Sequence, residues 1–300
     1  MAWARLESVT RQGAGTLRSV LGIAAALSAL LIGACGTRGD HLNTPAATVL
    51  TQAAYVSGRE PGYVYTMRFT IALGGRSVAA TGTGTIDRTG REGTLTEQIN
   101  GQTLTLLFKE PYVYAPVSTA KAVWRLPNTG IKPWVRADEA TYNESSNAAL
   151  GTGGNDPILT IGFLKAASRL TTVGTQKVNG VATTHYHAFV DYNRIAATAA
   201  PPLRPAARQN AQTLKRLTGT TALPIDVWID AQQHVRQVAL HLQACVPGYK
   251  FEDSVAFTIL HYANPPPVRV PPRAQLIDVT DLVKAQASQM RRLIEQIPGC

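Results

Sequence analysis

The sequence predicts an α+β fold in which one curved antiparallel sheet wraps over a few helices as a half-barrel. Residues 63–73 alternate between large apolar and smaller or polar side chains, the pattern of a half-buried strand. The pairs Gly74-Gly75, Asn100-Gly101 and Asn179-Gly180 separate strand-like runs at hairpin spacing. Helical periodicity is confined to about four segments, against about nine or ten strands, so a sheet of this size has to curl, close or be covered.

The first half of the chain is rich in strands. A helix is expected over residues 45–57, where Val49, Leu50, Ala53 and Ala54 recur at helical spacing. Antiparallel strands are then expected at 63–73, 76–86, 94–100, 103–109 and 111–116. Residues 123–134 have no regular period, and residues 143–154 read as a polar, glycine-rich loop.

The second half begins with a helix that is apolar on nearly every side. Asp156 and Pro157 provide an N-cap and a first-turn proline for a helix over 158–167. Such a helix is buried or lines an apolar cavity. Further strands are expected at 170–178, 180–191, 225–229, 238–242 and 249–259, and helices at 204–218 and 282–297. A concave sheet over these helices leaves room for an apolar cavity bordered by residues 158–164 and 63–73.

The N-terminus has the order of a secretory signal peptide: basic, apolar, then small residues. No charged residue occurs from Val20 to Ile32, and Gly33-Ala34 precede Cys35. This arrangement resembles a bacterial lipobox, in which the leader is cut before a cysteine that carries acyl chains. The alternatives are an ordinary cleaved signal and an uncleaved anchor, although the apolar run is short of the roughly 20 residues that span a bilayer.

These features divide the chain into a lipoprotein signal peptide (1–34), a lipidated tether (35–44) and one lipid-binding domain (45–300). The expected location is the extracytoplasmic face of the cell membrane, with Cys35 as the lipid anchor. Two further cysteines, Cys245 and Cys300, are expected to form a disulfide in a non-reducing compartment. Such a bridge would close a loop of about 55 residues and contribute roughly 4 kcal/mol in the chain-entropy model.

The charge of the chain is basic but scattered in sequence. The chain has 29 basic and 19 acidic residues, of which three basic and one acidic residue lie in residues 1–34. Residues 35–300 therefore have a net charge of +8. Because no Lys/Arg tract is present, a nucleic-acid partner is not expected. Diffuse positive charge suits an anionic membrane surface, and it is equally explained by a generally basic composition.

No residue pattern indicates an enzyme, a metal site or a cofactor. The sequence lacks a G-x-S-x-G elbow, an H-E-x-x-H motif and a P-loop. His185 and His187 share one strand face, and His241 was considered as a third metal ligand, but half-exposed strand positions explain them as well. Asp226 and Asp230 lie about 13 Å apart along a strand, too far to act as an acid pair.

Three tryptophans and a third aspartate are further candidates for a binding role. Trp124, Trp134 and Trp228 fit either a core or a cavity lining, and a core position is favoured. Asp191, like Asp226 and Asp230, is expected to face solvent or a turn.

The chain resembles the LolA-like lipoproteins of high-GC Gram-positive bacteria, the LppX/LprG group. The resemblance runs over most of the mature chain. It rests on the lipobox, on 110–114 (EPYVY) with 132–134 (KPW), on 179–192, on 223–230 (LPIDVWID) with Val235-Arg236, and on 262–272. It implies a curved sheet over helices, an apolar cavity for acyl chains and no catalytic residue. No ligand-binding residue is transferred, and the pair Cys245 and Cys300 lies outside the recognised pattern.

Together these observations predict a membrane-anchored protein that binds an acylated lipid or glycolipid of the cell envelope in a hydrophobic cavity, and transfer of that lipid is a further expectation. The alternative is a sensor or interaction lipoprotein that uses the same fold to bind an envelope protein.

Overall fold

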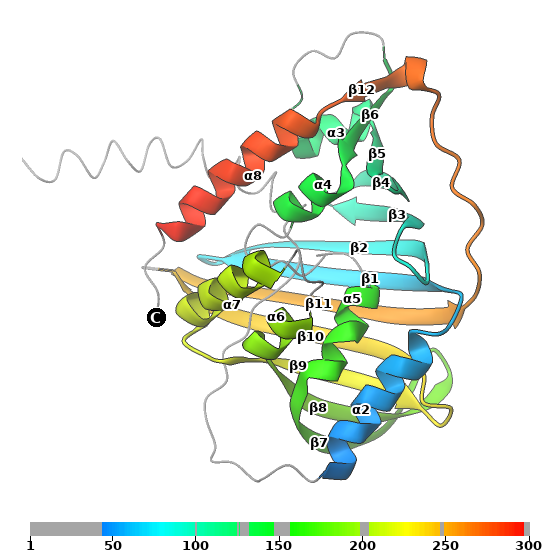
Figure 1. Ribbon diagram of the computed structural model, residues 1–300, viewed down its shortest axis with the longest axis vertical. Helices are drawn as coiled ribbons and strands as arrows, with labels where there is room; N and C mark the ends of the chain where they lie inside the picture. Colours follow the sequence, from blue (N-terminus) through cyan, green and yellow to red (C-terminus); the bar gives the residue numbers. More distant parts are fainter. Residues whose placement is uncertain are drawn as a thin grey trace, which may run out of the picture.

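A computed structural model describes residues 44–99, 101–124, 126, 132–146, 157–198, 204–246 and 249–296. Its main feature is one twelve-stranded sheet that curves around a layer of helices (Figure 1). In their order across the sheet the strands are β12 (Leu276–Asp278), β6 (Trp134–Asp138), β5 (Tyr112–Pro116), β4 (Gln102–Lys109), β3 (Glu92–Ile99), β2 (Arg76–Asp87), β1 (Gly62–Leu73), β11 (Tyr249–Tyr262), β10 (Val235–Val246), β9 (Ala222–Asp230), β8 (Val181–Asp191) and β7 (Ala167–Val178). Neighbouring strands are antiparallel, except that β12 runs parallel to β6. The predicted α+β half-barrel is confirmed.

The helices pack on the inner face of this sheet in two groups (Figure 1). The first, here called the α2 group, contains α2 (Thr44–Ser57), α5 (Pro157–Gly162), η1 (Phe163–Ala166), α6 (Tyr192–Thr198) and α7 (Arg204–Thr218). It contacts β7, β8 and β10. The second, the α8 group, contains α3 (Val117–Trp124), α4 (Glu139–Ser146) and α8 (Thr280–Glu295), and contacts β4, β5 and β6. A short 3₁₀ turn, η3 (Arg273–Gln275), precedes β12.

The alternation of β1 determines which side chains enter the core. Tyr63, Tyr65, Met67 and Phe69 are 2% exposed or less, and the residues between them face outward. The strand also needs a glycine on its neighbour, because a Cβ at Gly84 would lie 2.6 Å from the ring of Tyr65. Each fully buried large side chain contributes about 1.5–3 kcal/mol relative to exposure. The predicted strand is therefore confirmed in position and in face.

A buried polar network joins the end of α2 to the β9–β10 hairpin. The hydroxyl of Tyr63 donates to the carbonyl of Ser57 at 2.8 Å, and the amide of Val235 donates to the Ser57 hydroxyl at 2.9 Å. In the hairpin, Arg236 Nε donates to Asp230 Oδ2 at 2.6 Å, and the Asp230 side chain is only 1% exposed. These bonds fix the direction in which α2 crosses the sheet.

The structure differs from the sequence predictions in its short elements. The predicted helix 158–167 is divided: α5 ends at Gly162 and η1 continues to Ala166. The irregular stretch 123–134 and the loop 143–154 border α3, β6 and α4, none of which was predicted. Strand β12 and helix α6 were also missed. Among the described residues, no helix combines the length and hydrophobicity needed to cross a bilayer.

Candidate functional site

The central strands β11, β1, β2 and β3 carry a continuous apolar surface on the inner face of the sheet. We call it the inner strip. Its members are buried, with exposed fractions between 0% and 7%: Tyr65, Met67, Phe69, Ala80, Leu95, Ile99, Val255 and Phe257. The strand register places Phe257 beside Met67, and Phe69 beside Ala80. The strip lies between the strands that hold the α2 group and those that hold the α8 group (Figure 1).

Both predicted borders of the apolar cavity are buried. In α5 and η1, Ile161, Phe163 and Leu164 are 3%, 7% and 0% exposed, and they belong to the same core cluster as Met67 and Phe69. The predicted apolar helix is therefore confirmed as two short buried elements, whose strand contacts are with β10 and β8. The cavity itself remains a prediction.

One acidic residue lies within the inner strip. Glu97 follows Leu95 on the same face of β3 and is 1% exposed. Burial raises the pKa of Glu97 to about 8, so the side chain is largely neutral at pH 7. Its register neighbour is Gly82, where a Cβ would lie 3.2 Å from Glu97 Cγ and 3.0 Å from Met67 Cγ. The strip thus contains one carboxylic acid, which can donate and accept a hydrogen bond.

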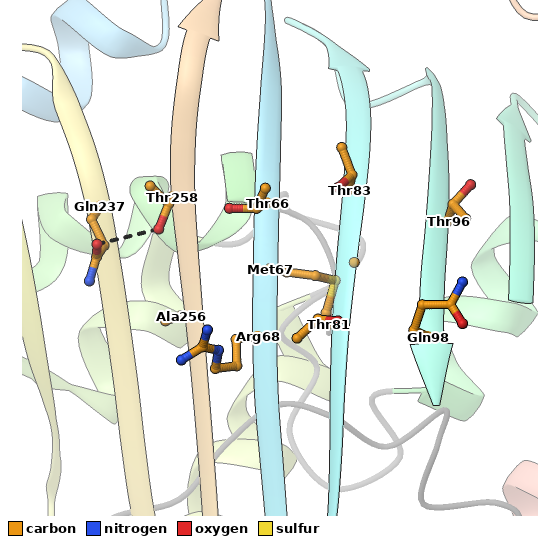
Figure 2. Close-up of a pocket in the computed structure, with 11 residues that line it drawn as sticks. Thr66, Met67, Arg68, Thr81, Thr83, Thr96, Gln98, Gln237, Ala256 and Thr258 are labelled. Atoms are coloured by element: carbon orange, nitrogen blue, oxygen red, sulfur yellow. Dashed lines mark hydrogen bonds between the residues drawn. The ribbon is translucent and has the colours of Figure 1, made fainter. Parts of the chain in front are cut away.

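The outer face of the same strands carries a different surface. The pocket drawn in Figure 2 lies there, with the helices behind the sheet, and its volume is about 640 Å³. Most of its side chains are hydroxyls, amides and one guanidinium, from Thr66, Thr81, Thr83, Thr96, Thr258, Gln98, Gln237 and Arg68, and Met67 and Ala256 also line it. Two of them already bond each other, since Thr258 Oγ1 donates to Gln237 Oε1 at 3.3 Å. This polar lining is not the predicted apolar cavity and does not suit acyl chains.

The two strand histidines contact an aspartate rather than a third histidine. His185 Nε2 and His187 Nδ1 lie 2.8 and 3.2 Å from Asp226 Oδ1. The hydrogen bond with Asp226 raises the pKa of His187. Burial would raise the pKa of Asp226, but the bonds from His187 and His185 outweigh it and lower that pKa. His241 instead bonds Ser254 through Nδ1 at 2.6 Å.

Within the described residues, no group of three or more His, Cys, Asp or Glu side chains is arranged to hold a metal ion. The interpretation of Asp226 as merely solvent-facing was incomplete, because it joins the two histidines. Asp230 forms the buried pair with Arg236, and Asp191 accepts from the amides of Asn193 and Arg194 at the start of α6.

The tryptophans have separate roles. Trp228 is 8% exposed and stacks on His185 with ring centroids 4.3 Å apart, outside the apolar core cluster. Trp134 is half-buried in β6 opposite Pro116. The side chain of Trp124 lies outside the described residues.

The predicted anchor and disulfide fall largely outside the described part of the chain. Cys35 and Cys300 are not among the described residues, nor are the signal peptide and residues 35–43 of the tether. Cys245 is in β10 with Lys250 as its register partner, and its side chain is not described. The disulfide remains a prediction.

Three solved structures illustrate what the chain is similar to. The lipoprotein LppX from Mycobacterium tuberculosis shares 13% identity at a TM-score of 0.44, over 76% of this chain and 100% of that one. LprF from Mycobacterium bovis shares 11% identity at a TM-score of 0.37, over 78% of this chain and 99% of that one. A LolA superfamily protein from Nitrosomonas europaea shares 6% identity at a TM-score of 0.26, over 76% of this chain and 96% of that one.

These structures include a lipoprotein and a LolA superfamily protein, the class of protein that the sequence resembles. No protein-family profile matches the sequence, and no curated protein matches it. At these identities and TM-scores, the similarities establish neither family membership nor function.

Proposed function

We propose that this protein is a membrane-anchored extracytoplasmic lipoprotein that binds and transfers an acylated lipid or glycolipid of the cell envelope. The observation that carries the proposal is the inner strip, a broad apolar surface between two separate helix groups. Acyl chains would lie against this strip, beneath α5 and η1. The proposal assigns no catalytic residue.

The chemistry of the strip fits a hydrocarbon ligand. Its side chains are apolar apart from the hydroxyl of Tyr65 and the carboxyl of Glu97, and moving hydrocarbon from water to such a surface contributes about 0.8 kcal/mol for each methylene. About ten buried methylenes would therefore contribute on the order of 8 kcal/mol before the cost of ordering the chain. Because the strip is already covered, a ligand would have to displace side chains or separate the two helix groups.

Glu97 would supply the one polar contact in this apolar setting. A neutral carboxylic acid can donate a hydrogen bond to an ester carbonyl and accept one from a hydroxyl. Both groups occur where acyl chains join a lipid headgroup. The raised pKa of Glu97 keeps this donor available at neutral pH.

The anchor would hold this site near its ligand. Cys35 precedes the start of α2 at Thr44 by nine residues, which span at most about 30 Å when extended. A Cys35→Ala variant should lose acylation and pass from the membrane to the soluble fraction. If Cys35→Ala were acylated and retained as strongly as the wild type, the anchor assignment would fail.

Two neighbouring alanines allow a matched test of the ligand site. Ala80 faces the strip at 2% exposure, whereas Ala79 on the same strand faces outward. An Ala80→Phe variant should fill the site and lower the amount of lipid that co-purifies, measured by mass spectrometry of the extracted protein. Ala79→Phe should retain the wild-type amount.

Circular dichroism would establish whether both variants are folded. If Ala80→Phe is not folded, Ala80→Leu is the milder replacement. Equal lipid content in both folded variants would contradict the assigned position. A wild-type protein with no lipid and one stoichiometric protein partner would favour the sensor alternative.

A further inference from the structure

The charged side chains of the α2 group are all basic. Across α2, α5, η1, α6 and α7 there is no Asp or Glu. The same helices carry six cations, Lys165, Arg194, Arg204, Arg208, Lys215 and Arg216. We propose that this layer is a docking surface for the anionic headgroups of a membrane, which turns the α2 group toward the bilayer. The inference rests on the proposed work at a membrane and adds a second contact to the anchor.

The six cations come together only in the folded chain. Helix α6 packs on both α7 and η1, which brings Lys165, Arg194 and the α7 cations into one region. Lys215 Nζ donates to Asn193 Oδ1 at 2.9 Å, and Arg194 donates to the carbonyl of Ala167 at 3.4 Å. Neither bond neutralises a positive charge.

Asp191, at the end of β8, is a carboxylate beside this region. It accepts the amides of Asn193 and Arg194, so it caps α6. A cap at this position uses the carboxylate to satisfy helix amides. The net charge of the region is therefore strongly positive even with Asp191 included.

Helix α7 presents its cations to the outside. Ala211, Leu214 and Leu217 are 4%, 3% and 4% exposed and form its buried side. Arg208 is exposed, and Arg216 follows two turns later on the same outer side. Long basic side chains in this position can cover apolar surface with their stems and reach headgroups with their charged ends.

A bilayer is the occupant that these features favour. The cations are spread over three helices rather than arranged along a groove, which suits a broad charged plane. The chain that leads from Cys35 enters this same layer at Thr44, the first residue of α2. Each Lys or Arg near an anionic membrane contributes about 1 kcal/mol, and salt screens the attraction within about 10 Å at 0.1 M.

Vesicle partitioning tests the proposal with the full chain carrying Cys35→Ala, so that acyl chains make no contribution. The test variant is Lys165→Glu/Arg204→Glu/Arg208→Glu, and all three positions are exposed. The matched control is Lys121→Glu/Lys284→Glu/Arg292→Glu, three exposed cations of the α8 group. Both variants lower the net charge equally.

On phosphatidylglycerol vesicles at 0.1 M salt, the test variant should bind roughly 100-fold more weakly and the control less than about threefold. On phosphatidylcholine vesicles, all proteins should bind alike. Equal losses in the two variants, or no preference for anionic vesicles, would overturn the proposal. So would wild-type binding to heparin in the absence of binding to the vesicles, which would point to a soluble polyanion.

A Lys165→Gln/Arg204→Gln/Arg208→Gln variant provides the same comparison if the glutamates prevent folding, with a loss of roughly 100-fold expected because the same three cations are removed. The amount of co-purified lipid distinguishes a failure of this inference from a failure of the proposed function. A test variant that docks weakly should still retain its co-purified lipid. A wild-type chain that docks but never carries lipid would contradict the proposed function alone.

Discussion

The two helix groups cover the same face of one sheet, yet their exposed surfaces differ in charge. The α2 group has six cations and no acid, whereas the α8 group has four of each: Lys121, Lys284, Arg291 and Arg292 against Glu139, Glu144, Asp281 and Glu295. Their buried surfaces are alike, with Leu50 and Leu164 in one and Val283 and Ala287 in the other. Because packing on the sheet is similar, it does not account for the difference in charge. The proposed docking of the α2 group on an anionic membrane accounts for it.

The groups also differ in the ion pair that lies beside each of them in the sheet. Near the end of α2, Asp230 of β9 and Arg236 of β10 form a buried pair. Ahead of α8, Arg136 of β6 and Asp278 of β12 form a pair whose side chains are 24% and 45% exposed. A buried pair leaves an uncompensated charge when one member is removed, while an exposed pair is rehydrated.

The largest expected effect is at Asp230. Replacing it with alanine leaves Arg236 without its carboxylate and removes the acceptor for the amides of Gln232 and His234. We expect Asp230→Ala to lower the free energy of unfolding by about 3–5 kcal/mol, measured by urea denaturation. A loss below about 1 kcal/mol would show that Arg236 is rehydrated when Asp230 is removed, as in an exposed pair.

The next effect comes from the apolar contacts of each group. Leu164 is 0% exposed, and Leu164→Ala should cost about 3 kcal/mol through lost burial and the cavity that remains. Val283 is 1% exposed, and Val283→Ala removes less volume, so about 2 kcal/mol is expected. Denaturation of both variants would check this order. The reverse order would mean that the α8 group carries more of the packing.

Between the groups, Glu97 should make stability depend on pH. Burial raises its pKa from the ordinary 4.5 to about 8, so the unfolded chain releases this proton first as pH rises. The fold should therefore lose stability as the pH rises from about 4.5 to 8. Glu97→Gln should remove this dependence. Thermal midpoints of the two proteins across that range would test it, and parallel curves would contradict the assignment.

The smallest effect is expected at Asp278. Its pair with Arg136 is partly exposed at 3.0 Å, so Asp278→Ala should cost about 1 kcal/mol or less. High salt should weaken the wild-type pair and reduce the difference between the two proteins. A loss as large as that of Asp230→Ala would remove the distinction between the buried ion pair and the exposed one.

Long alternating strands could be predicted from the sequence, and short elements could not. Strand β1 has eleven residues of regular alternation, so its position and inner face were correct. Strand β12 has three residues and β6 has five, which is too short for a period to be recognised. Their pairing depends on segments more than 130 residues apart.

The candidate site was predicted only in part for a related reason. The apolar helix and the β1 surface were identified, and the position of Glu97 between Leu95 and Ile99 could have been read from the same alternation. The contact of Asp226 with His185 and His187 depends on the register of β8 and β9, which no local pattern specifies. The charge imbalance of residues 157–218, eight cations to one acid, was visible in the sequence, whereas the grouping of six cations on helices required the fold.

The central claim is that acyl chains bind against the inner strip, and photocrosslinking tests its position directly. The protein would be loaded with a lipid that carries a diazirine on its acyl chain, and the labelled peptides would be identified by mass spectrometry. We expect labels on inner-facing residues such as Phe69, Leu95 and Ile99. Labels confined to the outer-face pocket at Thr81, Thr83 and Gln98, or no labelling of a folded and lipid-loaded protein, would contradict the claim.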